Sequence, residues 1–382
     1  CNNVAYGYRN KVEFSWYSES VASRAISQKK SEPALASPGL FSDDTRGIDA
    51  DSDREESSDD TLDLAFFRRG SKGKIVVDDT SLAHPAINNL ARAIRDLLRH
   101  KRVAARRLKT LLIRCDQSGS CVWQLYVKDR LPEIITATEA AKLLAQGGEI
   151  IYSDPLSPAS RITERLAHFG DTTLTDTVLG VPFRYACEGF FQVNIPVYEQ
   201  ALRDMKEWMS RESSYWQLGH HQKIIRDPRE VAQIFSEVPL AADQPILDFY
   251  AGVGTIGLTI GGGNVTLVEV NADAVREMQR NIAELDRTDA RAVLAPSEQA
   301  LDYITGKEIV IVDPPRAGLH PDVIATLLQQ LPPRIIYLSC NPVTQARDVR
   351  LLQEKYHIVH HRGYNFFPRT PHIEHLVILD KK

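Results

Sequence analysis

The sequence predicts an α/β fold with a doubly wound, mostly parallel sheet in its second half, preceded by an α+β domain. In the second half, short apolar runs alternate with helical patterns, as strands and crossover helices do. The expected strands are 245–249, 265–269, 308–312, 334–338, 356–364 and 374–379. One helix is expected directly after the glycine-rich turn that begins at residue 250. Further helices are expected at 272–285, 321–330 and 344–355.

The first half predicts a separate domain at 1–194, with the second domain at 195–382. Strands are expected at 12–17, 64–68, 108–114 and 121–128, and apolar spacing predicts a helix over 85–100. The segment 18–61 is rich in Ser, Asp and Glu and has few large apolar residues. We expect it to be a disordered acidic insert in one hairpin, because it cannot bury enough surface to offset its ordering entropy.

Composition indicates a globular protein with room for two cores, because the chain has 382 residues and a net charge of only −4. No apolar run approaches 18 residues, so we expect no membrane span, and no secretory leader is recognisable. The five cysteines include no C-x-x-C. We therefore expect a reducing compartment, the cytoplasm, and neither a disulfide framework nor a metal or iron–sulfur site within these residues.

A glycine-rich turn follows the strand at 245–249. Gly252, Gly254 and Gly257 form G-x-G-x-x-G, which permits a tight turn and close approach of a ligand. Glu269 ends the next strand, where its carboxylate could accept both hydrogen bonds of a ribose diol. The pattern fits NAD or S-adenosylmethionine. The plain alternative is a strand–helix turn that binds nothing.

Three polar groups stand at strand ends. Cys340 follows an apolar run inside Ser-Cys-Asn-Pro, which places a thiol at the carboxyl end of a strand, where open α/β sheets hold ligands. Asp313 opens a stiff Asp-Pro-Pro-Arg loop, and Glu374 begins the last strand. The plain alternatives are a small buried cysteine, a chance Pro-Pro and a carboxylate that faces solvent.

Basic residues gather in the first half, where 99–109 carries six Lys or Arg and no acid. Charge runs are usually solvated surface, but further basic residues at 9, 11, 68, 69, 72 and 74 favour contact with phosphate. Phe-Phe-Gln-Val-Asn at 190–194 precedes a helix that Asn194 caps, with an aromatic core plug as the plain interpretation. Cys115 and Cys121 are expected on the two arms of one hairpin, without chemistry.

These motifs resemble the RNA uridine-C5-methyltransferases, the family that forms 5-methyluridine in tRNA and ribosomal RNA. The resemblance spans residues 190–382 and recurs at 8–14 and 66–71. Five motifs occur in that family's order: F-F-Q-V-N, D-x-Y-x-G-x-G-T, D-P-P-R-x-G-L, S-C-N-P-x-T-x-x-R-D and H-x-E. The resemblance implies a Rossmann-like class I methyltransferase domain preceded by an RNA-binding domain.

The resemblance also implies roles for residues, with Cys340 as nucleophile and Glu374 as base. The implied S-adenosylmethionine site contains Gln192, Tyr250, Gly252, Gly254, Thr255, Glu269 and Asp313. We expect the Cys340 thiolate to add to uracil C6 and Glu374 to remove the C5 proton, with no metal. The expected partner is RNA, with no membrane and no obligate protein partner. The tRNA T-loop is slightly favoured over ribosomal RNA.

The chain departs from the family in three ways. Many members carry an oligonucleotide-binding module and an iron–sulfur cysteine cluster, neither of which is present within these residues, and the segments 18–61 and 212–243 are unusual. Two other hypotheses remain. An NAD-dependent oxidoreductase with a reactive cysteine would explain the glycine turn but not Glu374 or the loop at Asp313. A catalytically silent RNA-binding relative would not need Cys340 and Glu374.

Overall fold

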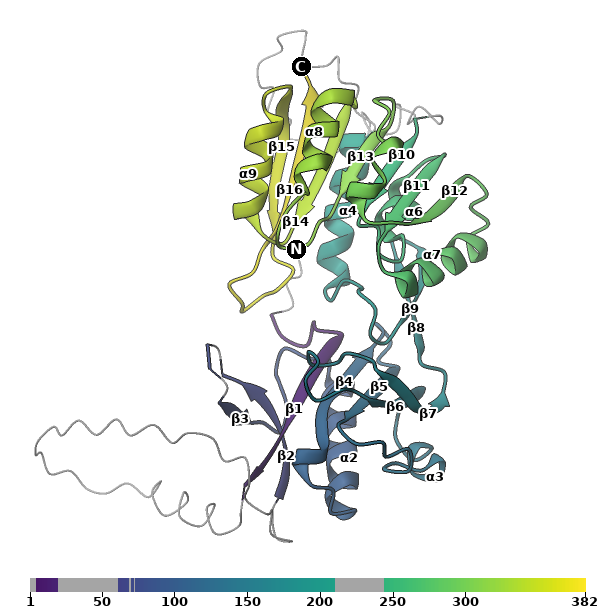
Figure 1. Ribbon diagram of the computed structural model, residues 1–382, viewed down its shortest axis with the longest axis vertical. Helices are drawn as coiled ribbons and strands as arrows, with labels where there is room; N and C mark the ends of the chain where they lie inside the picture. The colour runs from purple at the N-terminus through teal and green to yellow at the C-terminus, as the bar shows by residue number, and fades with distance from the viewer. Residues whose placement is uncertain (1–4, 20–60, 69, 72, 210–243) are drawn as a thin grey trace, which may run out of the picture. The chain divides into compact units, whose positions relative to one another are not determined.

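The computed structural model describes residues 5–19, 61–68, 70–71, 73–209 and 244–382 (Figure 1). The chain divides into two compact units, one made of residues 1–10 and 173–382 and the other of residues 11–172. The second unit is therefore inserted in the sequence of the first. Nearly all of the predicted acidic insert at 18–61 and of the stretch at 212–243 lies outside the described residues.

The inserted unit is built on a seven-stranded sheet of order β3-β2-β1-β4-β5-β6-β7. Its neighbours pair antiparallel except β5 and β6, which are parallel. Its strands are β1 (Lys11–Glu19), β2 (Thr61–Phe67), β3 (Lys74–Val76), β4 (Leu108–Cys115), β5 (Cys121–Val127), β6 (Gly147–Tyr152) and β7 (Glu164–Gly170). Its helices are α2 (Pro85–His100) and α3 (Ala137–Ala140), and a 3₁₀ turn spans Ala105–Arg107.

The apolar face of α2 accounts for the core of this unit. Ile87, Ile94 and Leu98 are fully buried in one cluster with Phe14 and Leu64 of the sheet, so the predicted helix packs as its spacing indicates. The predicted hairpins are confirmed, since β1 pairs with β2 and β4 with β5, both antiparallel. Cys115 and Cys121 lie opposite each other at the end of the second hairpin.

The other unit contains a seven-stranded sheet of order β12-β11-β10-β13-β14-β16-β15 and a two-stranded sheet, β8-β9 (Figure 1). The strands are β8 (Thr173–Val178), β9 (Val181–Ala186), β10 (Ile246–Phe249), β11 (Val265–Glu269), β12 (Ala290–Leu294), β13 (Ile309–Val312), β14 (Arg334–Ser339), β15 (Tyr356–Tyr364) and β16 (Glu374–Lys381). The helices are α4 (Ile195–Met209), α6 (Thr255–Ile260), α7 (Ala272–Glu284), α8 (Pro321–Gln330) and α9 (Pro342–Leu352), with 3₁₀ turns at Ser297–Gln299 and Leu301–Tyr303.

This larger sheet confirms the predicted fold class. Strands β10 to β14 run parallel, and β16 is antiparallel to both β14 and β15. The chain proceeds outward from β10 to β12 and then returns to β13 on the other side of β10. The carboxyl ends of β10 and β13 therefore flank a topological switch point, the place where such sheets bind ligands.

The compact units divide after Thr172, whereas the sequence suggests a division after residue 194. The hairpin β8–β9 belongs with the larger sheet because it is bonded to α7. The backbone N–H of Arg184 donates to Asn281 Oδ1 at 2.8 Å, and Asn281 Nδ2 donates back to the Arg184 carbonyl at 3.1 Å. The roles expected of the two domains stay predictions.

In the part of the chain that the structure describes, no helix is long and apolar enough to cross a membrane.

Candidate active site

The glycine-rich turn links β10 to α6 and requires left-handed backbone at three positions. Tyr250, Gly252 and Gly254 have φ values of 62°, 58° and 88°. A Cβ on Gly252 would meet no atom within 4 Å, so the space beside this turn is open. A Cβ on Gly257 would lie 2.6 Å from Leu267 Cδ2, so Gly257 lets α6 pack closely on β11.

Glu269, at the end of β11, lies directly against the turn. Its Oε2 accepts a hydrogen bond from the Gly252 N–H at 3.0 Å, and its Oε1 accepts one from the Asn271 N–H at 2.8 Å. A carboxylate oxygen can accept more than one hydrogen bond. The side chain is thus fixed in position and keeps acceptor capacity for a ligand.

Asp248 is a site residue that the sequence analysis did not single out. It is fully buried in β10, where its Oδ2 accepts from the Gly257 N–H at 2.9 Å. Its Oδ1 is also buried and has no hydrogen-bond partner. Burial raises the pKa of Asp248 to about 8 against the opposing bond from Gly257, and the charges of Asp313 and Glu269 act in the same direction as burial. The sequence signal that could have identified Asp248 is its position two residues before Tyr250, at the start of the motif D-x-Y-x-G-x-G-T.

Tyr250 and Thr255 also occupy the turn. The Ser297 hydroxyl donates to the Tyr250 hydroxyl at 2.7 Å, which ties the turn to the segment after β12. Thr255 is buried as the first residue of α6. The glycine motif, Tyr250, Thr255 and Glu269 therefore lie together around the switch point, and their binding of a cofactor stays a prediction.

Cys340 lies at the carboxyl end of β14, as the sequence predicts, and is partly exposed. The next residue, Asn341, caps α9, and its Nδ2 donates to the Arg316 carbonyl at 2.9 Å. The Thr344 hydroxyl donates to the same carbonyl at 3.1 Å. The Asp-Pro-Pro-Arg loop after β13 is therefore tied to the turn that carries the thiol.

Glu374 reaches the same edge from the opposite direction. Because β16 runs antiparallel to β14, its first residue lies beside the last residues of β14, and Ser339 is paired with His375. Cys340 and Glu374 each come one residue beyond that pair. Glu374 is only 4% exposed, so the alternative of a carboxylate that faces solvent is wrong.

Burial dominates the electrostatics of this edge. Burial raises the pKa of Glu374, the charge of Asp313 adds to the increase, and Arg316 opposes it. Burial likewise raises the pKa of the Cys340 thiol, with the charges of Glu374 and Asp313 adding and Arg316 opposing. Burial raises the pKa of Asp313 as well. Three acidic groups thus share one region with one guanidinium, an arrangement typical of functional sites.

Gln192 is buried beside the N-terminal residues of the same unit. The Asn10 Nδ2 donates to the Gln192 carbonyl at 3.1 Å, and Asn194 Nδ2 donates to the Phe366 carbonyl at 3.1 Å. The Tyr8 hydroxyl donates to the Pro368 carbonyl at 3.0 Å. Residues 8–10 and 192–194 therefore meet around the loop that precedes Glu374.

Three of the six basic residues in the run at 99–109 are paired with acids of their own unit. Lys101 Nζ lies 2.8 Å from Glu139 Oε2, Arg107 Nε lies 2.9 Å from Asp129 Oδ2, and Arg99 pairs with Asp63. Lys109 Nζ donates to oxygens of the loop at 153–157. The proposed contact of this run with phosphate stays a prediction, and it would require exchange of these partners.

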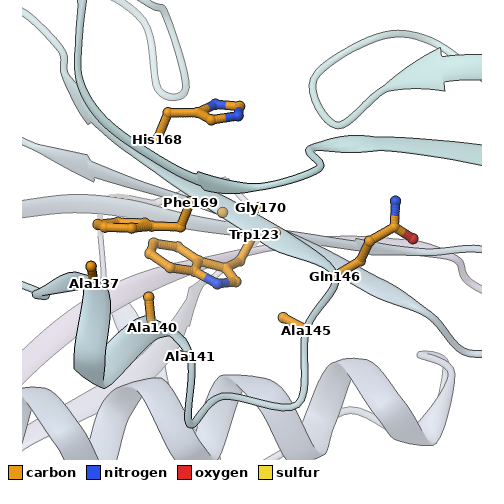
Figure 2. Close-up of a pocket in the computed structure, with 11 residues that line it drawn as sticks. Trp123, Ala137, Ala140, Ala141, Ala145, Gln146, His168, Phe169 and Gly170 are labelled. Atoms are coloured by element: carbon orange, nitrogen blue, oxygen red, sulfur yellow. The ribbon is translucent and has the colours of Figure 1, made fainter.

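A cavity of about 410 Å³ lies in the inserted unit, and no residue of the predicted site lines it. Figure 2 shows it between Trp123 and Phe169 on one side and the small residues of the segment 137–145 on the other. The Trp123 and Phe169 rings stack at 5.8 Å. The residues that line it are mostly apolar or small, and His168 is the one titratable residue among them. Among the described residues, no cluster of three His, Cys, Asp or Glu could hold a metal ion.

Comparisons with known proteins point to one family. Residues 263–382 match the family model described as tRNA (Uracil-5-)-methyltransferase. An uncharacterized RNA methyltransferase of Nitratidesulfovibrio vulgaris is 36% identical over 43% of this chain and 38% of its own length. Another, of Streptococcus mutans, is 27% identical over 84% of this chain and 69% of its own length. This chain thus spans well under half of the first relative and about two thirds of the second.

A solved structure shares the fold over nearly the whole chain. The crystal structure of Pyrococcus abyssi tRNA (uracil-54, C5)-methyltransferase in complex with S-adenosyl-L-homocysteine has a TM-score of 0.69. It is 20% identical, and the match covers 99% of this chain and 77% of that one. These findings confirm the resemblance and the enzyme class predicted from the motifs: residues 263–382 match the tRNA (Uracil-5-)-methyltransferase family model, and over 84% of its length the chain is similar to an RNA methyltransferase.

Proposed function

We propose that the chain methylates C5 of a uridine in structured RNA, with the tRNA T-loop favoured over ribosomal RNA, through a covalent adduct between Cys340 and uracil C6. The observation that carries this proposal is the arrival of Cys340 and Glu374 at one sheet edge from neighbouring antiparallel strands. A nucleophile and a base so placed can act on adjacent atoms of one ring. The relative from Pyrococcus abyssi, named for uracil 54 of tRNA, supports the choice of tRNA.

The residues around the glycine turn suit S-adenosylmethionine. The open space beside Gly252 leaves room for a ligand, and the unpartnered buried Oδ1 of Asp248 is an acceptor suited to an ammonium group. Glu269 keeps acceptor capacity for a ribose diol. Gln192, Tyr250, Gly254, Thr255 and Asp313 would complete the site. When bound, S-adenosylmethionine supplies an electrophilic methyl group on a sulfonium.

Cys340 provides the activation that uracil needs. C5 of a neutral uracil is a poor nucleophile, and addition of a thiolate to C6 forms an S–C6 bond and moves an electron pair toward C5. The thiol must first lose its proton, which burial disfavours. Arg316 opposes that effect, and we assign it the role of stabilising the thiolate.

Glu374 completes the reaction after C5 has taken the methyl group. C5 then carries both the methyl group and its original proton. The Glu374 carboxylate removes that proton, the electron pair restores the C5–C6 double bond, and the C6–S bond breaks to release the Cys340 thiolate. Once Glu374 has ionised, its raised pKa makes it a stronger base, and the proton that it accepts then passes to solvent.

The substrate side of the proposal follows from this geometry. The target base must leave its stack to reach a thiol at a sheet edge, which favours a loop nucleotide. Basic residues of the inserted unit would hold the RNA backbone and make binding salt-sensitive. We further propose that the protein acts in the cytoplasm, where its cysteines stay reduced.

The test uses RNA from cells that lack the corresponding gene, incubated with the protein and methyl-labelled S-adenosylmethionine. The tRNA and ribosomal RNA fractions are digested separately, and labelled nucleosides are identified. We expect label in 5-methyluridine of tRNA, absent with Cys340→Ala and retained with Cys187→Ala, which removes a buried cysteine that we assign no chemistry.

Label only in the ribosomal fraction would overturn the choice of tRNA and keep the chemistry. Absence of 5-methyluridine from both fractions, with S-adenosylhomocysteine binding intact, would favour the catalytically silent relative. The NAD-dependent alternative would require tight binding of NADH instead, and it leaves the two bonds from the Cys340 turn to the Arg316 carbonyl without a purpose.

A further inference from the structure

Gln345 makes hydrogen bonds to both strands that carry the Cys340–Glu374 edge. It lies in the first turns of α9 and is 1% exposed. Its Nε2 donates to the Tyr337 carbonyl at 2.9 Å and to the His375 carbonyl at 3.0 Å. Its Oε1 lies 2.7 Å from His375 Nδ1. Both donors of the amide and its oxygen are thus used.

The two carbonyl contacts fix the orientation of this amide. Because Nε2 must face the two carbonyl oxygens, Oε1 must accept from His375, so Nδ1 of that imidazole carries the hydrogen. Burial lowers the pKa of His375, and His361 on β15 acts in the same direction. The bond therefore joins two neutral groups. Its partner on β16 is the residue directly after Glu374.

One side chain thus connects three elements that surround the reacting groups. Tyr337 lies on β14, three residues before Cys340, and Gln345 itself lies on the helix that begins directly after the thiol. His375 belongs to the last pair of the β14–β16 ladder, at Ser339–His375. Glu374 comes beyond that pair, at the first residue of β16, where its strand partner is Tyr364 of β15 and β14 no longer pairs with it.

We propose that Gln345 is a positioning residue that holds the beginning of β16, and with it Glu374, in a fixed place beside Cys340. This inference rests on the proposed roles of Cys340 and Glu374. The base must reach the proton on C5 while the thiol is bonded to the adjacent C6, which leaves little tolerance in their spacing. A displacement of about 1 Å in such a site can cost ~100-fold in rate.

The test replaces Gln345 with leucine, which is similar in size and makes no hydrogen bonds. Gln353→Leu, at the exposed end of the same helix, is the matched control. We expect kcat to fall ~10–100-fold in Gln345→Leu with the KM for S-adenosylmethionine unchanged. Because Cys340 keeps its place on β14, the adduct should still form and then accumulate as an RNA–protein band in a denaturing gel.

A second measurement needs no RNA. Hydrogen exchange of the amides at 374–377 should quicken in Gln345→Leu and stay unchanged in Gln353→Leu. If the leucine variant does not bind S-adenosylhomocysteine, Gln345→Met, which keeps the unbranched shape, takes its place in both measurements.

Three results would overturn the inference. The first is an unchanged kcat, and the second is unchanged exchange at 374–377. The third is a parallel loss of kcat, adduct and S-adenosylhomocysteine affinity in Gln345→Met as well as in Gln345→Leu, which would indicate general structural support. If the unmodified protein makes no 5-methyluridine, the proposed function fails, and the exchange measurement still decides whether Gln345 holds β16.

Discussion

The buried charged residues at the two ends of the β14–β16 pair are in opposite situations. At one end, Arg334 and Asp380 are paired across the strands, with Nε–Oδ1 and Nη2–Oδ2 distances of 2.6 and 2.7 Å, and Arg334 also bonds the Trp208 carbonyl. At the other end, burial raises the pKa of Glu374, the charge of Asp313 raises it further, and Arg316 opposes the increase. The same two strands therefore carry a buried ion pair at one end and a buried acid with a raised pKa at the other.

This contrast separates residues that stabilise the fold from residues that serve the reaction. A bidentate arginine–carboxylate pair fixes its partners and has no proton to exchange near neutral pH. A carboxyl group with a raised pKa costs stability when it ionises and is suited to proton transfer. Substitutions at the two ends should therefore move stability and activity in different directions.

The largest expected effect is on turnover, in Glu374→Gln. Loss of a general base lowers the rate by ~10²–10⁴-fold, and the adduct with Cys340 should persist. We would measure 5-methyluridine formation and the RNA–protein band together, with Glu354→Gln as the exposed control. Fast turnover in Glu374→Gln would assign the base to another residue.

The same variant should be more stable than the unmodified protein at alkaline pH. The folded-state pKa of Glu374 lies above the unfolded value, so the folded protein holds an extra proton and its free energy of unfolding falls as pH rises between the two values. Glutamine removes that slope. Each kcal/mol gained raises Tm by ~1–2 °C in a protein of this size. An equal or lower Tm at pH 8 than the unmodified protein would contradict the assignment.

At the opposite end of the strand pair, we expect a substitution to change the stability of the protein. Asp380→Asn leaves Arg334 buried without its counter-charge, which costs ~3–5 kcal/mol of the free energy of unfolding. Urea denaturation measures this cost. Asp273→Asn, in an exposed pair with Arg276, should cost less than ~1 kcal/mol. Similar losses in the two variants would show that the Arg334–Asp380 pair is not effectively buried.

Two glycines of the turn permit a finer comparison. An alanine at Gly257 would place its Cβ 2.6 Å from Leu267 and 3.0 Å from Asp248, so we expect a loss of ~1–3 kcal/mol in unfolding free energy. An alanine at Gly252 meets no atom but keeps a φ of 58°, which costs ~1–2 kcal/mol. Gly252→Ala should in addition weaken S-adenosylhomocysteine binding, measured by calorimetry. Weaker binding in Gly257→Ala alone would contradict the placement of the ligand.

The smallest expected effect concerns Arg316, which lowers the pKa of both Cys340 and Glu374. In Arg316→Gln both pKa values should rise, so alkylation of Cys340 by iodoacetamide at pH 7 should slow by ~3–10-fold and regain its rate at higher pH. Arg350→Gln, on an exposed position of α9, is the control. An unshifted pH profile would remove Arg316 from the electrostatics of the thiol.

Local sequence patterns predicted most of the helices and strands, because each such element follows from the hydrophobic pattern of neighbouring residues. The run Ile335–Leu338 is wholly apolar and is a buried strand, and α8 begins and ends at Pro321 and Gln330 as predicted. Strand β12 was not predicted, since Ala290–Leu294 is an edge strand of partly exposed residues without a clear period. Edge strands carry a weak signal because neither face is fully buried.

Features of the site that depend on pairing between distant strands could not be predicted from the sequence. Motif order placed Cys340 and Glu269 correctly at strand ends, whereas the burial of Glu374 depends on the pairing of β16 with both β14 and β15. The unpartnered oxygen of Asp248 depends on the close packing of α6 that Gly257 permits. No local sequence pattern predicts the burial of Glu374 or the unpartnered oxygen of Asp248, because each arises from elements distant in sequence.

The strand order has a consequence for synthesis on the ribosome. Strand β16 follows every other described strand in sequence, yet it lies inside the sheet, between β14 and β15. Until it emerges, the edges of β14 and β15 that it will join stay open, and the site has a thiol without a base. Domains commonly fold as units during translation, so the inserted unit can fold early, whereas catalytic competence must wait for the last strand to be made.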